Sequence, residues 1–442
     1  MSSANYPCRD SGIYHNLPQF DPKLTGLTAL ITGANGISGY NTLLALLDSP
    51  QRWAKVFTLS RRPLPAEMMN LIPAELRNRI QHISCDLQAE PATIAKTLEL
   101  AGVQVDYIFF YAYLQPRPPP GERAWSNQQE LLDVNSALLR NFLRAIPQAG
   151  IRPKRFLLQT GAKNYGPHIG RARTPNVESD PQPRHLGPNF YYAQEDLLFE
   201  YCEKYEVEWN IIRPPWIIGS SMTAQMCALY PFAVYAAVNA ERNLPLRFPS
   251  SWSFWQQNCS HFGTARLTGY LSEWAILEDK CKNQAFNSQD TSPISWDRIF
   301  AEYVRWFGVE KGVLPPPDQE SGLLELKLNG GKDSPMGYGP PIVELLSFTI
   351  LSWAQDPENQ KAWKRIQDRD HLTFDPFEDI EGNFTFSDTV FMTFGPLSMN
   401  KARRLGWTGF VDTMESIFEM YQEMNQLGML PKLEVGEALP LI

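Results

Sequence analysis

Short apolar runs alternate with longer stretches in which apolar residues recur every three to four positions. The first pattern is typical of buried strands and the second of amphipathic helices. Because the two patterns alternate through the first half of the chain, we expect an α/β protein with a parallel sheet covered by helices on both faces. The patterns predict strands at 27–32, 55–60, 80–84, 106–110, 155–159 and 208–212, a returning strand within 281–287, and helices at 127–148 and 189–205.

After Arg213 this alternation stops, and the second half of the chain predicts a smaller, mostly helical unit. We expect a loose N-terminal arm at 1–25, a main domain at 26–215 with a returning segment near 262–300, and a cap made of 216–261 and 301–442. The cap would lie over the carboxyl edge of the sheet, where open α/β sheets bind ligands. The cap elements expected are helices at 222–239, 343–351, 358–367 and 410–427, loops at 315–317 and 330–341, and an irregular aromatic lid around Trp252–Trp255.

Three glycines stand between the first predicted strand and the helix that follows it. A strand, a glycine turn and a helix in this order predict a dinucleotide site, because the turn lets the backbone approach a pyrophosphate at the helix N-terminus. The spacing G-x-x-G-x-x-G resembles that of short-chain dehydrogenases/reductases and predicts a doubly wound Rossmann sheet. The site residues expected here are Thr32, Gly33, Asn35, Gly36, Ile37 and Gly39.

The ends of the next two strands supply candidate contacts for the rest of that cofactor. Ser60, Arg61 and Arg62 end the second strand. An acidic residue there would hold the ribose of NAD(H), whereas arginine matches a 2′-phosphate, so NADP(H) is favoured over NAD(H). A solvated basic turn is the alternative interpretation. Asp86 and Leu87 follow the third strand, where Asp86 would either hold the adenine ring or cap a helix.

Composition narrows the class of protein. The 442 residues carry a net charge of −8, which argues against a dominant role in nucleic-acid binding. Six scattered cysteines form no C-x-x-C pair, so neither a zinc site nor a disulfide framework is indicated, and a reducing cytoplasm fits. No apolar stretch is long enough to span a membrane. We expect no metal, a hydrophobic small-molecule substrate and no nucleic-acid partner; a homodimer stays open.

Tyr191 is the candidate acid–base group. In short-chain reductases a lysine four residues later lowers the pKa of the tyrosine, but here that position holds Glu195, whose carboxylate would oppose phenolate formation. Lys163, just after the fifth strand, would supply the cation from another direction. Glu195 and Asp196 point about 100° apart on a helix, so we interpret both as structural groups that bond nearby backbone.

Two motifs carry a more specific resemblance. Residues 160–165 read T-G-A-K-N-Y and residues 189–196 read N-F-Y-Y-A-Q-E-D. Together with the glycine turn, the paired arginines and the segments 399–403 and 409–413, they resemble the progesterone 5-beta-reductase and iridoid synthase-like enzymes. The resemblance runs from about 27 to 427. Asn164 departs from the usual histidine, and Pro215-Trp216 departs from the usual loop that follows Arg213.

The resemblance implies an NADPH-dependent reductase that acts on an enone or enal of specialised metabolism, with Lys163 and Tyr191 acting together on the carbonyl. Tyr111 and Tyr113, which follow the fourth strand, would line the pocket or simply pack. The further residues expected are cofactor contacts at Tyr111, Thr160, Gly161, Lys163, Tyr191, Pro214 and Ile217, and substrate contacts at Tyr113, Tyr165, Trp216 and Trp252.

Three other functions stay open on the same residues: carbonyl reduction or alcohol oxidation, redox-neutral isomerisation, epimerisation or cyclisation, and a non-catalytic NADP sensor. Asn135 would either support the active-site helix or lie on a helix surface. His168 and His185, which lie between the two motifs without a visible partner, are interpreted as loop histidines.

Overall fold

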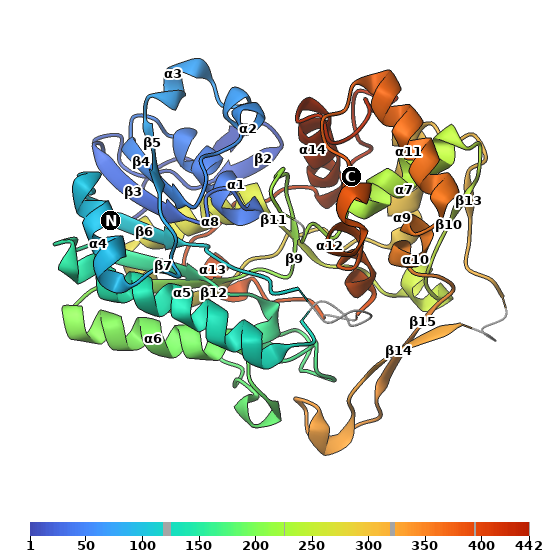
Figure 1. Ribbon diagram of the computed structural model, residues 1–442. Helices are drawn as coiled ribbons and strands as arrows, with labels where there is room; N and C mark the ends of the chain where they lie inside the picture. Colours follow the sequence, from blue (N-terminus) through green and yellow to red (C-terminus); the bar gives the residue numbers. More distant parts are fainter. Residues whose placement is uncertain (118–124, 225, 319–322, 393–394, 442) are drawn as a thin grey trace.

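A seven-stranded parallel sheet forms the centre of one lobe in the computed structural model (Figure 1). Its strand order is β12-β8-β7-β6-β3-β4-β5. The structure describes residues 1–117, 125–224, 226–318, 323–392 and 395–441. The strands are β3 (Leu27–Thr32), β4 (Trp53–Ser60), β5 (Ile80–Ser84), β6 (Tyr107–Phe110), β7 (Arg155–Gln159), β8 (Glu208–Arg213) and β12 (Gln284–Asn287).

Helices cover both faces of this sheet, as the alternating pattern predicted. On one face α1 and α8 pack on each other, and on the other face α5 packs between α4 and α6. Successive residues of β3 enter different cores, with Ile31 on the α1 side and Leu30 on the α5 side. The doubly wound Rossmann sheet is therefore confirmed. Its helices are α1 (Ile37–Leu47), α2 (Ala66–Asn70), α3 (Ala74–Arg77), α4 (Pro91–Leu100), α5 (Gln128–Gln148), α6 (Phe190–Tyr205) and α8 (Ala265–Leu277).

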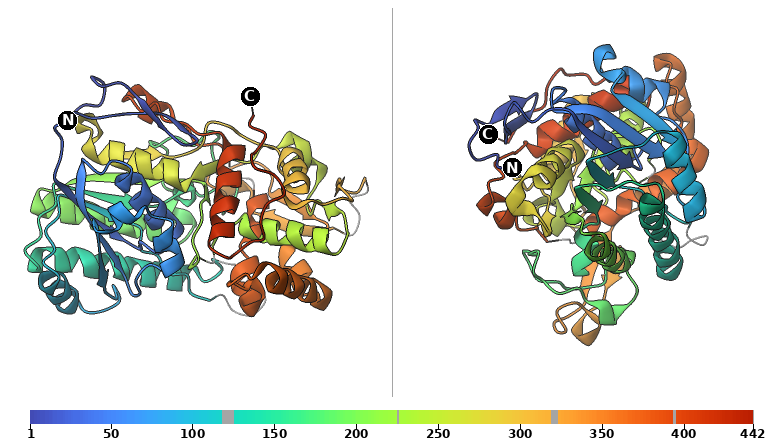
Figure 2. Two further views of the ribbon diagram at one scale, coloured as in Figure 1. Left: turned by 90° about the horizontal axis from the view of Figure 1, so that it is seen from above. Right: turned by 90° about the vertical axis from the view of Figure 1, so that its left-hand side faces the viewer.

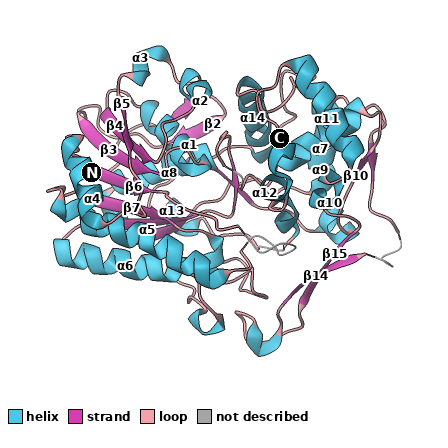
Figure 3. Ribbon diagram, viewed as in Figure 1, coloured by secondary structure: helices cyan, strands magenta, loops and turns pink. Residues whose placement is uncertain are grey.

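The second lobe is mostly helical and lies beside the carboxyl ends of the strands (Figure 3). Its core is aromatic: Phe248, Trp296, Phe300 and Phe391 pack with ring centroids 5.2–6.1 Å apart. Short strands β9 (Trp216–Ile218) and β11 (Phe262–Thr264) pair beside the junction of the lobes. The cap elements are α7 (Tyr230–Glu241), β10 (Leu246–Arg247), α9 (Trp296–Phe307), β13 (Val313–Leu314), β14 (Leu324–Leu328), β15 (Ile342–Leu346), α10 (Ile350–Ala354), α11 (Pro357–Asp370), α12 (Ile380–Phe384) and α14 (Thr413–Gln426).

Several expectations for the cap are wrong. The helix expected at 343–351 is instead β15, which pairs with β14 in an antiparallel hairpin; burial there alternates, which suits a strand. The helix expected from 222 begins at Tyr230, where Pro231 fits its first turn. The aromatic segment is not a lid. Phe254 and Trp255 are buried in the cap core, although Trp252 stays 37% exposed.

The N-terminal segment is an ordered hairpin rather than a loose arm. Strands β1 (Arg9–Ser11) and β2 (Tyr14–Leu17) pair, and the segment crosses over α8 (Figure 2). The ring centroids of Tyr14 and Tyr270 lie 5.5 Å apart. Ser3 donates its backbone N–H to Glu278, and His15 forms a β-bridge with Phe410 beside α13 (Asn400–Arg404). Apolar residues Tyr14, Leu17 and Phe20 are buried, so burial holds this segment in place.

Candidate active site

The glycine turn joins β3 to α1 at the carboxyl edge of the sheet. Gly33 has φ +66°, and a Cβ there would lie 2.8 Å from the backbone of Tyr111. A Cβ on Gly39 would lie 2.3 Å from the carbonyl oxygen of Gly33. Helix α1 then begins at Ile37 with no acidic residue in its first turn. A turn that excludes side chains, followed by a helix N-terminus that no side chain caps, fits a pyrophosphate.

Asn35 holds this turn against the end of β4. Its amide donates to the carbonyls of Arg62, at 2.8 Å, and Pro63, at 3.1 Å, and its side-chain oxygen accepts from Ser60. Arg61 and Arg62 are exposed, and neither makes an ion pair with any residue that the structure describes. Two unpaired guanidinium groups beside the glycine turn fit the 2′-phosphate of NADP(H).

Other expected cofactor residues are engaged within the protein. Thr32 accepts hydrogen bonds from the backbone N–H groups of Tyr111 and Ala112 through its Oγ1, at 3.2 and 3.3 Å. The Tyr111 hydroxyl accepts from Thr42 on α1, so this side chain packs inside the sheet lobe. The exposed Asp86 accepts from the backbone N–H of Gln88 in a local turn, and its neighbour Leu87 is buried. By contrast, the buried Oγ1 of Thr160 has no partner in the described ranges, which leaves it available to a ligand.

Lys163 lies in a single 3-10 turn, Ala162–Tyr165, directly after β7. The side chain is 9% exposed, and its Nζ lies 3.7 Å from the ring centroid of Trp125 and 5.8 Å from that of Phe190. No carboxylate among the described residues pairs with it. Burial therefore lowers the pKa of Lys163 to about 7. The 3-10 turn itself is fixed by the Ala162 N–H, which donates to the carbonyl of Pro214.

Tyr191 lies in the first turn of α6, next to this 3-10 turn. Asn189 caps the helix: its side-chain oxygen accepts from the Tyr191 N–H at 3.0 Å, while its amide donates to the carbonyl of Lys163 at 3.0 Å. One asparagine thus ties the two candidate catalytic residues together through their backbones. A Cβ on Gly161 would lie 3.0 Å from the Tyr191 hydroxyl, so glycine leaves room for that group. Burial raises the pKa of Tyr191, so the phenol stays protonated.

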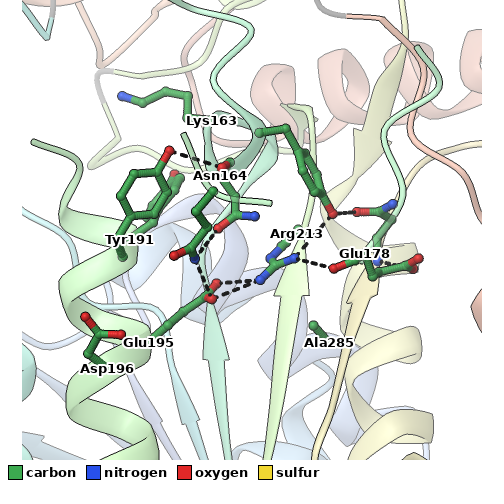
Figure 4. Close-up of polar contacts among 12 residues, drawn as sticks. Lys163, Asn164, Glu178, Tyr191, Glu195, Asp196, Arg213 and Ala285 are labelled. Carbon is green, nitrogen blue, oxygen red and sulfur yellow. Dashed lines mark hydrogen bonds and ion pairs between the residues drawn. The ribbon is translucent and has the colours of Figure 1, made fainter. Parts of the chain in front are cut away.

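Glu195 belongs to a buried network behind the site (Figure 4). Both of its carboxylate oxygens accept from Arg213, at 2.8 and 2.9 Å, and one also accepts from Gln182. Gln182 reaches on to Asn164, whose side-chain oxygen accepts at 2.8 Å. Glu195 is therefore structural, as expected, but its main partner is a guanidinium rather than backbone. In Figure 4 the Lys163 amine points away from this network.

The expected substrate residues separate into two groups. Trp216 stacks on Trp125 with centroids 6.2 Å apart, and Tyr113 packs 5.6 Å from Phe190, so both reach the surroundings of Lys163. The Tyr165 hydroxyl instead donates to Asn287 at 2.6 Å within the buried network. The structure places Trp252 at the exposed edge of the cap. Ile217 lies in β9 beside Trp216, where it is partly buried.

Two residues that the structure brings to this site could hardly be predicted from the sequence. His168 lies in a loop, as expected, and the structure adds that it lines the same cavity as Lys163. Asn135 on α5 is fully buried and binds both the N–H and the carbonyl of Leu114, while its own carbonyl accepts from Gln194 of α6. This excludes the helix-surface alternative. A glycine three residues after Lys163 was the one available signal for His168, because it lets the chain turn back.

The sheet, the glycine turn and the lysine–tyrosine pair define a Rossmann-fold protein related to short-chain reductases. The model of PRISE-like Rossmann-fold domains matches residues 29–327, and the chain belongs to this family.

Several relatives agree with this membership, and a solved structure shares the fold. A short chain dehydrogenase of Penicillium aethiopicum is 29% identical over 92% of this chain and 99% of its own. The 3-oxo-Delta(4,5)-steroid 5-beta-reductase of Arabidopsis thaliana is 28% identical over 91% and 93%. An (S)-8-oxocitronellyl enol synthase of Camptotheca acuminata is also 28% identical over 91% and 93%. The terminal R domain of the myxalamid biosynthetic pathway shares the fold, with a TM-score of 0.57, 13% identity and coverage of 92% and 93%.

Two further kinds of feature are absent from the described residues. None of their helices is both long and apolar enough to cross a membrane. Within the same ranges, no three histidine, cysteine, aspartate or glutamate side chains gather as they would around a metal ion.

Proposed function

We propose that this protein is an NADPH-dependent reductase that saturates the carbon–carbon double bond of an α,β-unsaturated carbonyl compound. The observation that carries the proposal is a buried lysine with no counter-ion among the described residues, which Asn189 holds next to a neutral tyrosine. Apolar walls formed by Trp125 and Phe190 favour a hydrophobic small molecule.

Bound NADPH would supply a hydride, which adds to the β-carbon of the substrate. The electron pair of the double bond then moves toward the carbonyl, whose oxygen becomes an enolate. The Lys163 ammonium and the Tyr191 hydroxyl would donate hydrogen bonds to that oxygen as its charge develops. Donors aimed at developing charge contribute about 2.7–4 kcal/mol each in comparable sites. A proton from water at the α-carbon completes the saturated carbonyl.

This reaction does not require the lysine that short-chain reductases carry at the position of Glu195. Because the final proton goes to carbon, Tyr191 can stay protonated and act only as a hydrogen-bond donor. The carboxylate of Glu195 is neutralised by Arg213, at 2.8 Å, so its field at the tyrosine is small. The site therefore works without a lysine one turn beyond Tyr191. The names of two relatives support the same reaction class, since the steroid 5-beta-reductase is named for an enone substrate and the enol synthase for an enol product.

The test is to incubate the protein with NADPH and a panel that holds an acyclic enal, a cyclohexenone and a steroid enone. Oxidation of NADPH and the mass of the product are followed for wild type, Tyr191→Phe and Tyr192→Phe. Tyr192 is the matched control, because its hydroxyl donates to the backbone of Asn164 inside the protein.

A saturated carbonyl product that only Tyr191→Phe loses would support the proposal. An allylic alcohol would instead indicate carbonyl reduction. Tight NADPH binding without turnover across an extended panel would favour redox-neutral chemistry or a sensor.

A further inference from the structure

The cavity at Lys163 holds more polar chemistry than reduction of a plain enone requires. Leu131 and Phe190 give it apolar walls, and Gln128, Lys163, His168 and Asn189 give it polar groups. The polar atoms of Asn189 are already used by the Lys163 carbonyl and the Tyr191 N–H. Lys163 has its role in the proposed reaction. His168 has none.

The backbone reverses direction after Lys163 and so brings His168 close to the lysine. The 3-10 turn ends at Gly166, which has φ +80° and whose N–H donates to the Lys163 carbonyl. The Ile169 N–H then donates to the Gly166 carbonyl, so the chain reverses within six residues of Lys163. The hairpin β14–β15 holds this turn from the cap side, because the Asn329 N–H donates to the Ile169 carbonyl at 2.8 Å.

His168 is a polar group without a protein partner. Its Nδ1 is buried and bonds nothing in the described parts of the chain. Burial, together with the neighbouring Lys163 charge, lowers the pKa of His168 well below its usual value, so the ring is neutral. A neutral imidazole offers one N–H donor and one nitrogen acceptor. Leaving such a group unpaired is unfavourable, and an apolar ligand would leave it so.

We propose that His168 is a specificity-determining residue that binds a second oxygen of the substrate, a hydroxyl or carbonyl close to the carbonyl held by Lys163. This inference rests on the proposed function. It makes the preferred substrate an enone or enal that carries a second oxygen, rather than one whose only oxygen is that of the conjugated carbonyl. A site built to hydrogen-bond a substrate group discriminates strongly against an analogue that lacks it, because the protein group is then buried without a partner.

The kinetic test compares 2-cyclohexenone with regioisomers that carry one hydroxyl at each saturated ring position in turn. For wild type, we expect the best hydroxylated isomer to have at least a tenfold higher kcat/KM than the parent, mostly through KM. His168→Phe should remove that preference and keep turnover of the parent enone, and His168→Asn should restore part of it. His185→Phe, at an exposed loop histidine, is the matched control. An unchanged preference in His168→Phe would overturn the proposal.

A binding test separates this proposal from the reductase reaction. Trp125 lies in the same cavity, which in this structure has a volume of about 20 Å³, so a ligand that reaches Lys163 must displace the indole and alter its fluorescence. Binding of saturated hydroxycyclohexanones and of cyclohexanone is measured by fluorescence in the presence of NADP⁺. Weaker binding of only the hydroxylated ligands to His168→Phe supports the proposal even if no enone is reduced. Equal binding of both ligands to wild type and His168→Phe refutes it, whatever the enzyme turns over.

Discussion

The glycine turn and the Lys163 pocket lie at the same edge of the sheet but are built in different ways. The turn is mostly local: residues 33–36 join β3 to α1, with outside contacts to the Tyr111 backbone and, through Asn35, to the end of β4 and to Ser221 and Thr223. The pocket is assembled from the 3-10 turn after β7, the start of α6, and aromatic side chains that include Trp216 and Phe386 from beyond the sheet. The proposed cofactor site thus takes its shape mainly from residues close in sequence, and the proposed substrate pocket takes its shape from tertiary packing.

If the pocket depends on packing, its most sensitive point is the buried network behind it. Glu195→Gln leaves the Arg213 guanidinium buried without its counter-charge, and we expect a loss of about 3–5 kcal/mol in the free energy of unfolding. Asp196→Asn, next along the helix, breaks an ion pair with Arg184 whose two side chains are 56% and 50% exposed, and should change stability by about 0–1 kcal/mol. Urea unfolding of the two variants gives both values. Equal losses would contradict the distinction.

Substitutions in the Lys163 pocket and in the glycine turn should also affect different kinetic constants. Lys163→Met removes a charged donor from the pocket, so we expect kcat to fall about 10²–10³-fold, with a much smaller change in the dissociation constant for NADPH. Lys401→Met is the control, because that half-buried ammonium donates to the Ala285 carbonyl outside the pocket. A variant that loses NADPH binding and turnover together would show that the lysine belongs to the cofactor site instead.

The charge on Lys163 gives the pocket a pH dependence that the glycine turn lacks. Burial lowers the pKa of this ammonium to about 7, so the donor is present below that pH and is lost as the pH rises through it. At saturating NADPH, kcat/KM should therefore fall by about tenfold per pH unit on the alkaline side. Lys163→Arg keeps its charge and should move the fall to higher pH. A flat profile for wild type from pH 6 to 9 would be incompatible with a role for the ammonium.

On the cofactor side, the smallest effect is expected at the exposed arginines. Replacing Arg61 and Arg62 together by alanine should reduce the preference for NADPH over NADH about tenfold, because solvent screens exposed charges. The kcat at saturating NADPH should stay near wild type. The ratio of kcat/KM for the two nucleotides measures the effect, and an unchanged ratio would place selection elsewhere.

The same contrast explains what the sequence could and could not predict. The strands, the sheet and the glycine turn follow from local patterns, and the structure confirms them. Trp255 carries the same apolar character as a lid residue, and only its neighbours Phe248 and Phe300 place it in the cap core. Residues 343–346 form a strand because 324–328 pair with them, which no local pattern reveals. The position of His168 could not be predicted for the same reason. It lies in a loop, and only the turn after Lys163 brings it into the cavity.

The N-terminal hairpin carries a consequence for how the chain is made. Ser3 bonds Glu278, and His15 bridges to Phe410, so residues of this segment pair with residues that are synthesised much later. Contacts this distant along the chain close late and slow the final folding step. Until α8 is made, the Tyr14 ring has no Tyr270 to pack against. A nascent chain that stalls before residue 410 would therefore leave this hairpin without its β-bridge partner and exposed to contacts with other chains.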